Sequence, residues 1–280
     1  MTAFETGRVE SADGTVVGYR RLGHGPALIL LHGAMQAAQN LAALAATLAD
    51  EYEVYVPDRR GRGLSGPYGP EHGIRQEVED LRAVVAASGA TRVFGLSGGA
   101  LVSLRTAMCT PQLTRIALYE PPLSVRGSAP VAWLPRYERE LGAGRTAAAL
   151  ATALRGMGTE PLFARVPRSV LVPLMSVGSR LQATGRADVP VAELIPTLPH
   201  DMRLVAELAD TVAEYAALDA DVLLLGGGRS PGYLRTALDE LAAVLPRHRR
   251  VTFDRLGHSG PDDDGDPARV AAALRSFFAD

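Results

Sequence analysis

Short apolar runs alternate with longer helical patterns along most of the chain, and this alternation limits the possible folds more than any other feature. It is typical of βαβ units, in which parallel strands form one sheet flanked by helices. Eight runs have the character of strands: 8–10, 16–20, 27–31, 52–56, 92–96, 116–119, 222–225 and 250–253. The first two flank Asp13-Gly14, a hairpin signal. We therefore expect an α/β protein with a mostly parallel, eight-stranded sheet.

The alternation lapses between Pro121 and about Leu218, where helical stretches occur without a clear strand. Elsewhere helices are expected at 40–48, 74–87, 100–108, 233–245 and 267–278. A helical excursion between two strands of one sheet indicates an inserted cap. The predicted organisation is a core made of residues 1–121 and 219–280, with a helical cap over residues 122–218.

Composition excludes several classes of function. The formal net charge of −2 gives no broad electrostatic attraction for nucleic acid or an anionic membrane. All 29 basic residues are arginine, so a lysine Schiff base, a lysine-bound pyridoxal phosphate and a P-loop lysine are impossible. The single cysteine, Cys109, allows no intrachain disulfide, and we expect it to be a small buried side chain on the helix of residues 100–108.

The chain is expected to be cytoplasmic. Met1–Gly14 contains acidic residues and lacks the apolar region of a signal peptide. No apolar run approaches the ~18 residues that a membrane-spanning helix needs. The expected partner is a small-molecule substrate, with neither nucleic acid nor membrane, and a homodimer is left open.

The segment Gly95-Leu96-Ser97-Gly98-Gly99 matches the pattern G-x-S-x-G, with an apolar strand before it and a helical pattern after it. In this context the serine lies on a sharp turn that holds its hydroxyl above the sheet edge. The glycines on either side leave room where strand and helix approach closely. The positive end of the helix favours negative charge that develops there. Ser97 is therefore the predicted nucleophile.

A second loop, Leu30–Ala34, follows the buried strand 27–31 and has the character of an oxyanion loop. We expect the N–H of Ala34 to supply one donor and the N–H of Gly98, the residue after the nucleophile, to supply the other. His32 is expected to brace this loop rather than to take part in the reaction.

His258 is the predicted general base. It follows the last strand and precedes the C-terminal helix, within Leu256–Gly260, which fits the chain order nucleophile, acid, histidine. Four other histidines lie in turn-like segments or beside charged or proline residues and are expected to be solvated: His24, His72, His200 and His248.

Together these motifs resemble the α/β-hydrolase superfamily over nearly the whole chain, and the segment Asp58–Ser65 resembles that family's D-x-R-G-x-G-x-S loop after the fourth strand. The resemblance implies an α/β-hydrolase fold and a serine mechanism. It leaves esterases, lactonases, thioesterases, C–C bond hydrolases and cofactor-free haloperoxidases open. Epoxide hydrolases and haloalkane dehalogenases carry an aspartate at the nucleophile position, so Ser97 argues against both.

The sequence departs from this family at the acid. The commonest position is the loop after the seventh strand, but Gly226–Pro231 contains no carboxylate, and the next one is Asp239, inside the following helix. Glu120 ends the sixth strand, next to the strand that carries Ser97. Some members of the superfamily place their acid there, so Glu120 is the predicted partner of His258.

Two further patterns resemble known binding motifs but lack features that those motifs require. Gly61–Gly66 is a literal G-x-G-x-x-G, but Pro67–Pro70 follows it where a dinucleotide site needs a helix. Asp262–Asp266 resembles a calcium loop, yet lacks the required glycine spacing and final glutamate. We expect a solvated loop and helix N-cap there. The sequence has no zinc-ligand spacing, and neither a cofactor nor a metal is expected.

The expected function is hydrolysis of an ester or lactone of a small to medium apolar substrate through an acyl-enzyme. C–C bond hydrolysis and cofactor-free haloperoxidase or perhydrolase chemistry could use the same three side chains. A ligand-binding, receptor-like protein on a hydrolase scaffold is the alternative of another class.

Overall fold

The computed structural model describes residues 4–183 and 189–279. Within them the chain forms one eight-stranded sheet of order β1-β2-β4-β3-β5-β6-β7-β8. The strands are β1 Glu5–Glu10, β2 Val16–Gly23, β3 Ala27–Leu31, β4 Glu53–Pro57, β5 Arg92–Leu96, β6 Arg115–Tyr119, β7 Asp221–Gly227 and β8 His248–Phe253. β2 pairs antiparallel with both β1 and β4, and the pairs from β4 to β8 are parallel. The expected mostly parallel sheet is confirmed.

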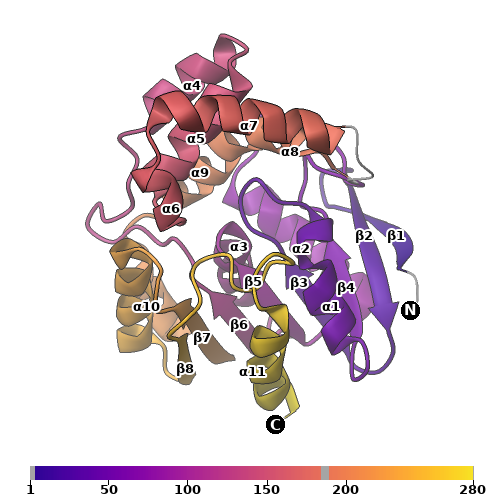
Figure 1. Ribbon diagram of the computed structural model, residues 1–280. Helices are drawn as coiled ribbons and strands as arrows, with labels where there is room; N and C mark the ends of the chain where they lie inside the picture. The colour runs from indigo at the N-terminus through magenta and orange to yellow at the C-terminus, as the bar shows by residue number, and fades with distance from the viewer. Residues whose placement is uncertain (1–3, 184–188, 280) are drawn as a thin grey trace.

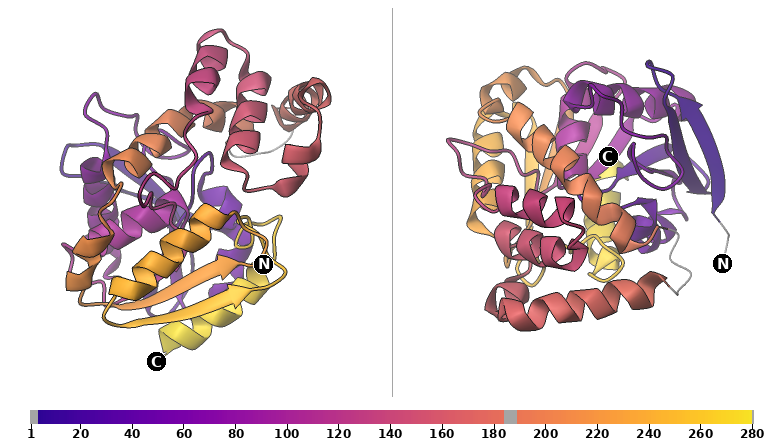
Figure 2. Two further views of the ribbon diagram at one scale, coloured as in Figure 1. Left: turned by 90° about the vertical axis from the view of Figure 1, so that its left-hand side faces the viewer. Right: turned by 90° about the horizontal axis from the view of Figure 1, so that it is seen from above.

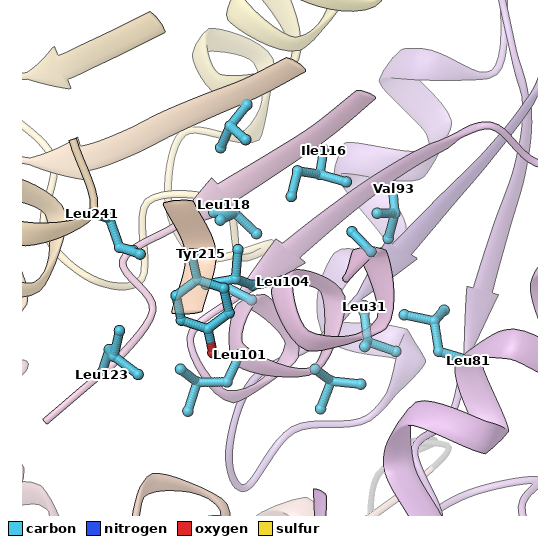
Figure 3. Packing of buried hydrophobic residues seen from close by; sticks show 14 of the residues in the cluster. Leu31, Leu81, Val93, Leu101, Leu104, Ile116, Leu118, Leu123, Tyr215 and Leu241 are labelled. Carbon is cyan, nitrogen blue, oxygen red and sulfur yellow. The ribbon is translucent and has the colours of Figure 1, made fainter. Parts of the chain in front are cut away.

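Helices cover both faces of the sheet (Figure 1). The flanking helices are α1 Ala42–Leu48, preceded by the 3-10 helix η1 Ala38–Leu41, α2 Ile74–Ser88, α3 Gly98–Ala107, α10 Gly232–Val244 and α11 Pro267–Ala279. α2, α3 and α10 share one buried apolar cluster with the sheet, and α1 and α11 share another on the opposite face. Figure 3 shows Leu104 of α3 beside Leu118 of β6 and Tyr215 in the first cluster. The sheet is thus the middle of three layers.

The segment between β6 and β7 is helical, and its described residues, 122–183 and 189–218, contain no strand. Its elements are α4 Leu134–Gly142, α5 Thr146–Met157, α6 Pro161–Arg165, α7 Arg168–Ala183, α8 Val191–Leu194, η2 Ile195–Thr197, α9 Leu198–Glu207 and η3 Val212–Ala217. Helices α4 to α9 lie together above the sheet, and the view from above shows them across that end of the molecule (Figures 1 and 2). Tyr137, Leu150 and Ile195 belong to a separate apolar cluster that holds these helices together. None of the described helices is long and apolar enough to cross a membrane.

The strands that carry the candidate site end in register. Leu96 of β5 pairs with Tyr119 of β6, which in turn pairs with Leu225 of β7. Beyond them the ladder continues for one step, because the N–H of Ser97 donates to the Tyr119 carbonyl at 2.8 Å and the N–H of Glu120 donates to the Leu225 carbonyl at 3.1 Å. Ser97 and Glu120 therefore leave the sheet side by side at its carboxyl edge.

Candidate active site

Ser97 occupies the sharp turn between β5 and α3 with φ 54° and ψ −118°. A positive φ costs a residue other than glycine roughly 1–3 kcal/mol, and such strain persists only where the surroundings enforce it. The sheet enforces it here through the hydrogen bond from the Ser97 N–H to Tyr119, and α3 begins at the next residue. Ser97 is 9% exposed and lines the mainly apolar cavity described below.

The glycines two before and two after Ser97 are required by close backbone contacts. A Cβ on Gly95 would lie 2.5 Å from the carbonyl oxygen of Gly99. A Cβ on Gly99 would lie 2.4 Å from the carbonyl oxygen of Leu31. A residue larger than glycine at either position would therefore clash with the backbone where β5, α3 and the end of β3 meet. This close packing fixes the position of Ser97.

Ala34 and Gly98 line the same cavity as Ser97, and the backbone N–H of each has no acceptor among the described residues. Gly98 is the first residue of α3, so its N–H has no partner within the helix. The N–H of Ala34 has no hydrogen-bond partner in the described part of the chain, whereas that of Gly33 already donates to Gln36 Oε1 at 2.8 Å. A Cβ added to Gly98 would lie 3.8 Å from Ala34 N. Ala34 and Gly98 thus present adjacent free donors, suited to a developing oxyanion.

His32 holds the loop that carries Ala34. Its ring is fully buried, with Nδ1 3.0 Å from the carbonyl oxygen of Gly33, and its Nε2 accepts a hydrogen bond of 3.1 Å from the N–H of Arg59. Because Nε2 accepts, the proton is on Nδ1. Burial, and after it the charges of Arg62 and Arg59, keep the pKa of His32 well below its ordinary value. The neutral ring therefore links two loops, as expected of a residue that braces the site.

Glu120 and His258 form a hydrogen-bonded pair. Glu120 Oε2 lies 2.7 Å from His258 Nδ1, and Glu120 Oε1 accepts a 2.6 Å hydrogen bond from the N–H of Gly227. Glu120 is fully buried and has a φ of 48°, a second strained residue at this edge of the sheet. The His258 side chain is 16% exposed and lines the cavity with Ser97. Both oxygens of the buried carboxylate are thus used, one to fix the histidine ring.

The glycine at the end of β7 makes room for this arrangement. A Cβ on Gly227 would lie 2.5 Å from the carbonyl oxygen of Leu256, in the loop that carries His258. The same loop is anchored from β6, because Tyr119 Oη donates to the Gly257 carbonyl at 2.7 Å. Burial raises the pKa of Tyr119, so its phenol stays a donor. The segment Gly226–Pro231, which contains no carboxylate, therefore packs closely against the loop that carries His258.

A buried ion-pair network adjoins the oxyanion loop and ties it to helix α9. Arg62 donates to both oxygens of Asp201 at 2.8 Å, and Arg59 donates to Asp201 Oδ1 at 2.8 Å and to both oxygens of Glu77. Burial alone would raise the pKa of Asp201, but the guanidinium groups of Arg62 and Arg59 hold it below its ordinary value. Arg62 also donates to the carbonyl of Gly33 at 3.0 Å.

The cavity beside Ser97 has a volume of about 280 Å³ and lies between the sheet edge and the helices of the insertion. Leu150, Leu154 and Met157 of α5 face it, and so do Leu198, Met202 and Val205 of α9. Both sets follow the spacing i, i+4, i+7, which places each on one helix face. Polar side chains gather toward the loop of His258: Gln36, Asn40, Thr159, Glu160, Ser259 and Asp262.

The structure brings the residues singled out in the sequence to one place. Ser97, His258, Ala34 and Gly98 all line the cavity, and Glu120 is hydrogen-bonded to His258 from beneath it.

Three other expectations are wrong in whole or in part. The expectation of a solvated loop and helix N-cap over Asp262–Asp266 fails at Asp262, which lines the cavity and has a buried Oδ1 without a hydrogen-bond partner among the described residues. The rest of that expectation is confirmed, because Asp263 and Asp264 are exposed and Asp266 Oδ1 accepts the N–H of Arg269 in the first turn of α11. His72 was expected to be solvated, yet it is buried edge-on against the ring of Tyr68, and burial lowers its pKa to about 4. Cys109 is exposed, because α3 ends at Ala107 and the chain turns outward.

Some residues of the site were not identified from the sequence. Asp201 lies 139 residues from Arg62, in a helix with no recognisable motif, so no sequence signal connects the two. Asp262, four residues after His258, could have been found from that proximity. Over residues 4–183 and 189–279, no group of three or more His, Cys, Asp or Glu side chains is arranged to hold a metal ion.

Known proteins resemble this chain over most of its length. The chain is 33% identical over 263 residues to a pimeloyl-(acyl-carrier protein) methyl ester esterase of Xanthomonas oryzae pv. oryzae, covering 92% of this chain and 97% of that protein. It is 37% identical over 133 residues to an N-formylmaleamate deformylase of Pseudomonas putida, covering 45% and 49%. The crystal structure of an α/β hydrolase from Sphaerobacter thermophilus superposes with a TM-score of 0.77 at 30% identity, covering 97% of this chain and 100% of that one. Since the model of the Alpha/beta hydrolase family matches residues 28–273, the chain belongs to the Alpha/beta hydrolase family.

Proposed function

We propose that this chain hydrolyses an ester or lactone of a small to medium apolar substrate through an acyl-enzyme on Ser97. The observation that carries the proposal is the hydrogen bond between Glu120 and His258, beside a cavity that also contains the strained Ser97. A nucleophile, a base and a buried group that orients the base are the parts that serine catalysis requires.

In the first half of the reaction, Glu120 accepts the Nδ1–H of His258, which leaves Nε2 free to take the Ser97 proton. Ser97 Oγ attacks the substrate carbonyl, and the carbonyl oxygen gains negative charge. The N–H groups of Ala34 and Gly98 bind that oxygen, an interaction that is worth about 3 kcal/mol per donor in comparable sites. His258 then gives its proton to the leaving alcohol oxygen, and the acyl group remains on Ser97.

In the second half, His258 Nε2 takes a proton from a water molecule, whose oxygen attacks the acyl carbonyl. The tetrahedral intermediate is held by the same two N–H groups. As it collapses, Ser97 Oγ leaves with the proton from His258, and the free acid departs. The carboxylate of Glu120 stabilises the imidazolium in both halves without becoming protonated itself.

The cavity supports a substrate of modest size and apolar character. Its volume of about 280 Å³ is small, and apolar side chains of α5 and α9 form the roof. Residues 122–218 act in this proposal as a cap that excludes water from the acyl-enzyme. The esterase activity named for the Xanthomonas oryzae relative supports ester hydrolysis as the reaction class.

The test is a panel of acyl esters, lactones and thioesters offered to the wild type and to Ser97→Ala. We expect ester or lactone turnover that falls by about a thousandfold or more in Ser97→Ala, because the nucleophile is lost. Unchanged turnover in that variant would exclude the serine mechanism.

Labelling by a fluorophosphonate probe separates an enzyme from a ligand-binding protein on the same scaffold. An activated serine reacts readily with the probe, so we expect labelling of the wild type and none of Ser97→Ala. A wild type that binds small esters but neither turns them over nor reacts with the probe would favour the ligand-binding alternative.

A further inference from the structure

The wall of the cavity beside Ser97 contains carboxyl groups both with and without a neighbouring cation. Three acidic side chains reach its wall, Glu160, Asp201 and Asp262, and the described residues that line it include no arginine. The chain contains no lysine at all. The three carboxyl groups differ in how far their charge is neutralised, and that difference decides what the cavity can accept.

Asp201 is neutralised by its surroundings. Arg59 and Arg62 both contact its carboxylate at 2.8 Å, and Glu77 balances the second positive charge through its own pair with Arg59. All four side chains are buried. This cluster carries no net charge, so it neither attracts nor repels a charged substrate strongly.

Asp262 has no such compensation. Gln36 Nε2 donates to its Oδ2 at 2.8 Å, and Gln36 is held in that orientation because its Oε1 accepts the N–H of Gly33. Oδ1 is buried without a hydrogen-bond partner in the described part of the chain. Burial raises the pKa of Asp262 to about 7, against the opposing effects of the Gln36 hydrogen bond and the His258 charge. The neighbouring Asp263 and Asp264 add further negative charge.

Glu160 is the second uncompensated carboxyl group. It precedes α6 in the helical insertion, and its Oε1 accepts a 2.8 Å hydrogen bond from Ser259 Oγ, next to His258. None of the ion pairs found between described residues includes it. Above about pH 7, Glu160 and Asp262 therefore place two negative charges on the side of the cavity that faces the loop of His258. Glu120 lies beneath this side, hydrogen-bonded to His258.

We propose that Asp262 and Glu160 are specificity-determining residues that restrict the site to esters and lactones without a carboxylate, and this inference rests on the proposed function. An anionic substrate would lose its hydration on entering an apolar cavity and find no cation there to replace it. It would also be repelled by carboxylates at short range in a medium of low polarity. A neutral substrate of the same shape meets neither penalty.

The experiment compares two esters that have the same shape and differ in charge. They are the mono(4-nitrophenyl) ester of glutaric acid, which ends in a carboxylate, and its counterpart that ends in a primary amide. At pH 8 the wild type should cleave the amide-ended ester with a kcat/KM about a hundredfold higher. Asp262→Asn and Glu160→Gln keep the shape and the hydrogen-bonding oxygens, and each should reduce this ratio by about tenfold.

The control is Asp219→Asn, an exposed change before β7 at the end opposite the cavity, which should leave the ratio as in the wild type. A wild-type ratio near one would overturn the proposal. So would a high ratio that neither Asp262→Asn nor Glu160→Gln lowers.

A binding measurement separates this inference from the proposed function. Calorimetry with Ser97→Ala and the two corresponding methyl esters should show at least about tenfold tighter binding of the amide-ended ligand, and Asp262→Asn in that background should narrow the gap. Selective binding without turnover of any ester by the wild type would contradict only the proposed function. Ester turnover by the wild type, together with equal binding of the two ligands by Ser97→Ala, would contradict only the proposed preference for uncharged substrates.

Discussion

Glu120 Oε2 lies 2.7 Å from His258 Nδ1, although 138 residues separate Glu120 and His258 in the chain. The contact depends on β6 ending in register with β5, so that the acid leaves the sheet beside Ser97. It depends equally on Gly227 at the end of β7, which is small enough to let the loop of His258 approach and whose N–H donates to the other carboxylate oxygen.

Glu120→Gln should lower kcat for ester hydrolysis by about a hundredfold or more. The amide keeps the size of the side chain but removes the charge that stabilises the imidazolium, and it can present an N–H to Nδ1 and so favour the wrong tautomer of His258. Steady-state kinetics on the best ester of the panel measures the effect.

The matched control for this change is Asp219→Asn, which removes a charge from an exposed ion pair with Arg247 at the opposite end of β7. It should leave kcat unchanged. Thermal unfolding should show that Glu120→Gln is folded, and a folded variant with wild-type kcat would remove Glu120 from the mechanism.

Asp201→Asn should destabilise the protein by about 3–5 kcal/mol, because it leaves the buried guanidinium groups of Arg59 and Arg62 without their shared counter-charge. The pKa values of both arginines are raised, so both side chains stay charged. They cannot avoid the cost of a buried, unpaired charge by losing a proton. Urea unfolding measures the loss.

Arg203→Gln on the same helix is the control for Asp201→Asn. Arg203 pairs with Glu207 at 2.7 Å in a half-exposed position, and such surface pairs contribute about 0.5 kcal/mol or less. If the two variants lose similar stability, the buried network does not hold α9 to the core.

Asp262→Asn should stabilise the protein at pH 8 and make little difference at pH 4. The folded-state pKa of Asp262 is raised from 3.8 to about 7, so the native state opposes its ionisation. Ionisation of Asp262 therefore lowers the free energy of unfolding of the wild type. This loss is absent below about pH 4, grows between pH 4 and pH 7 and is complete above pH 7, where it amounts to at most about 4 kcal/mol. Urea unfolding at both pH values measures the difference between variant and wild type.

Asp219→Asn, an exposed change at the opposite end of β7, should show no comparable pH dependence. The groups whose charges act on Asp262 are His258, Asp263 and Asp264. Equal stability of Asp262→Asn and wild type at pH 8 would mean that Asp262 is not held against ionisation.

The motifs with fixed local geometry could be predicted from the sequence. The turn at Ser97 requires a strand, a helix and close-packed glycines within five residues, and all of that is local. Glu120 could be identified because strand order brings the end of β6 next to β5, and because the glycines at 226–228 exclude the alternative position.

The surroundings of the site could not be predicted, because they depend on side chains that meet over long distances. The position of Asp262 in the cavity depends on Gln36, which lies 226 residues away, and a run of acidic residues by itself indicates a solvated loop. His72 is likewise buried by Tyr68 and His200, and only the folded helix α9 brings His200 there. These contacts join residues that are far apart in the chain, so no local sequence pattern predicts them.

Gly95→Ala should lower the free energy of unfolding by about 3 kcal/mol or more and abolish ester turnover. Its Cβ would lie 2.5 Å from the Gly99 carbonyl oxygen and 2.6 Å from Ala100 Cα, so only a backbone shift can relieve the contact. That shift would move α3 away from β5 and carry Ser97 and the Gly98 N–H out of line with His258.

Gly142→Ala is the matched control for Gly95→Ala, since no atom lies within 4 Å of its added Cβ at the end of α4. It should keep full turnover and gain up to about 1 kcal/mol from the better helix propensity of alanine. Urea unfolding and ester turnover of the two variants side by side decide the matter, and a Gly95→Ala protein with wild-type stability and activity would show that close packing does not fix the turn at Ser97.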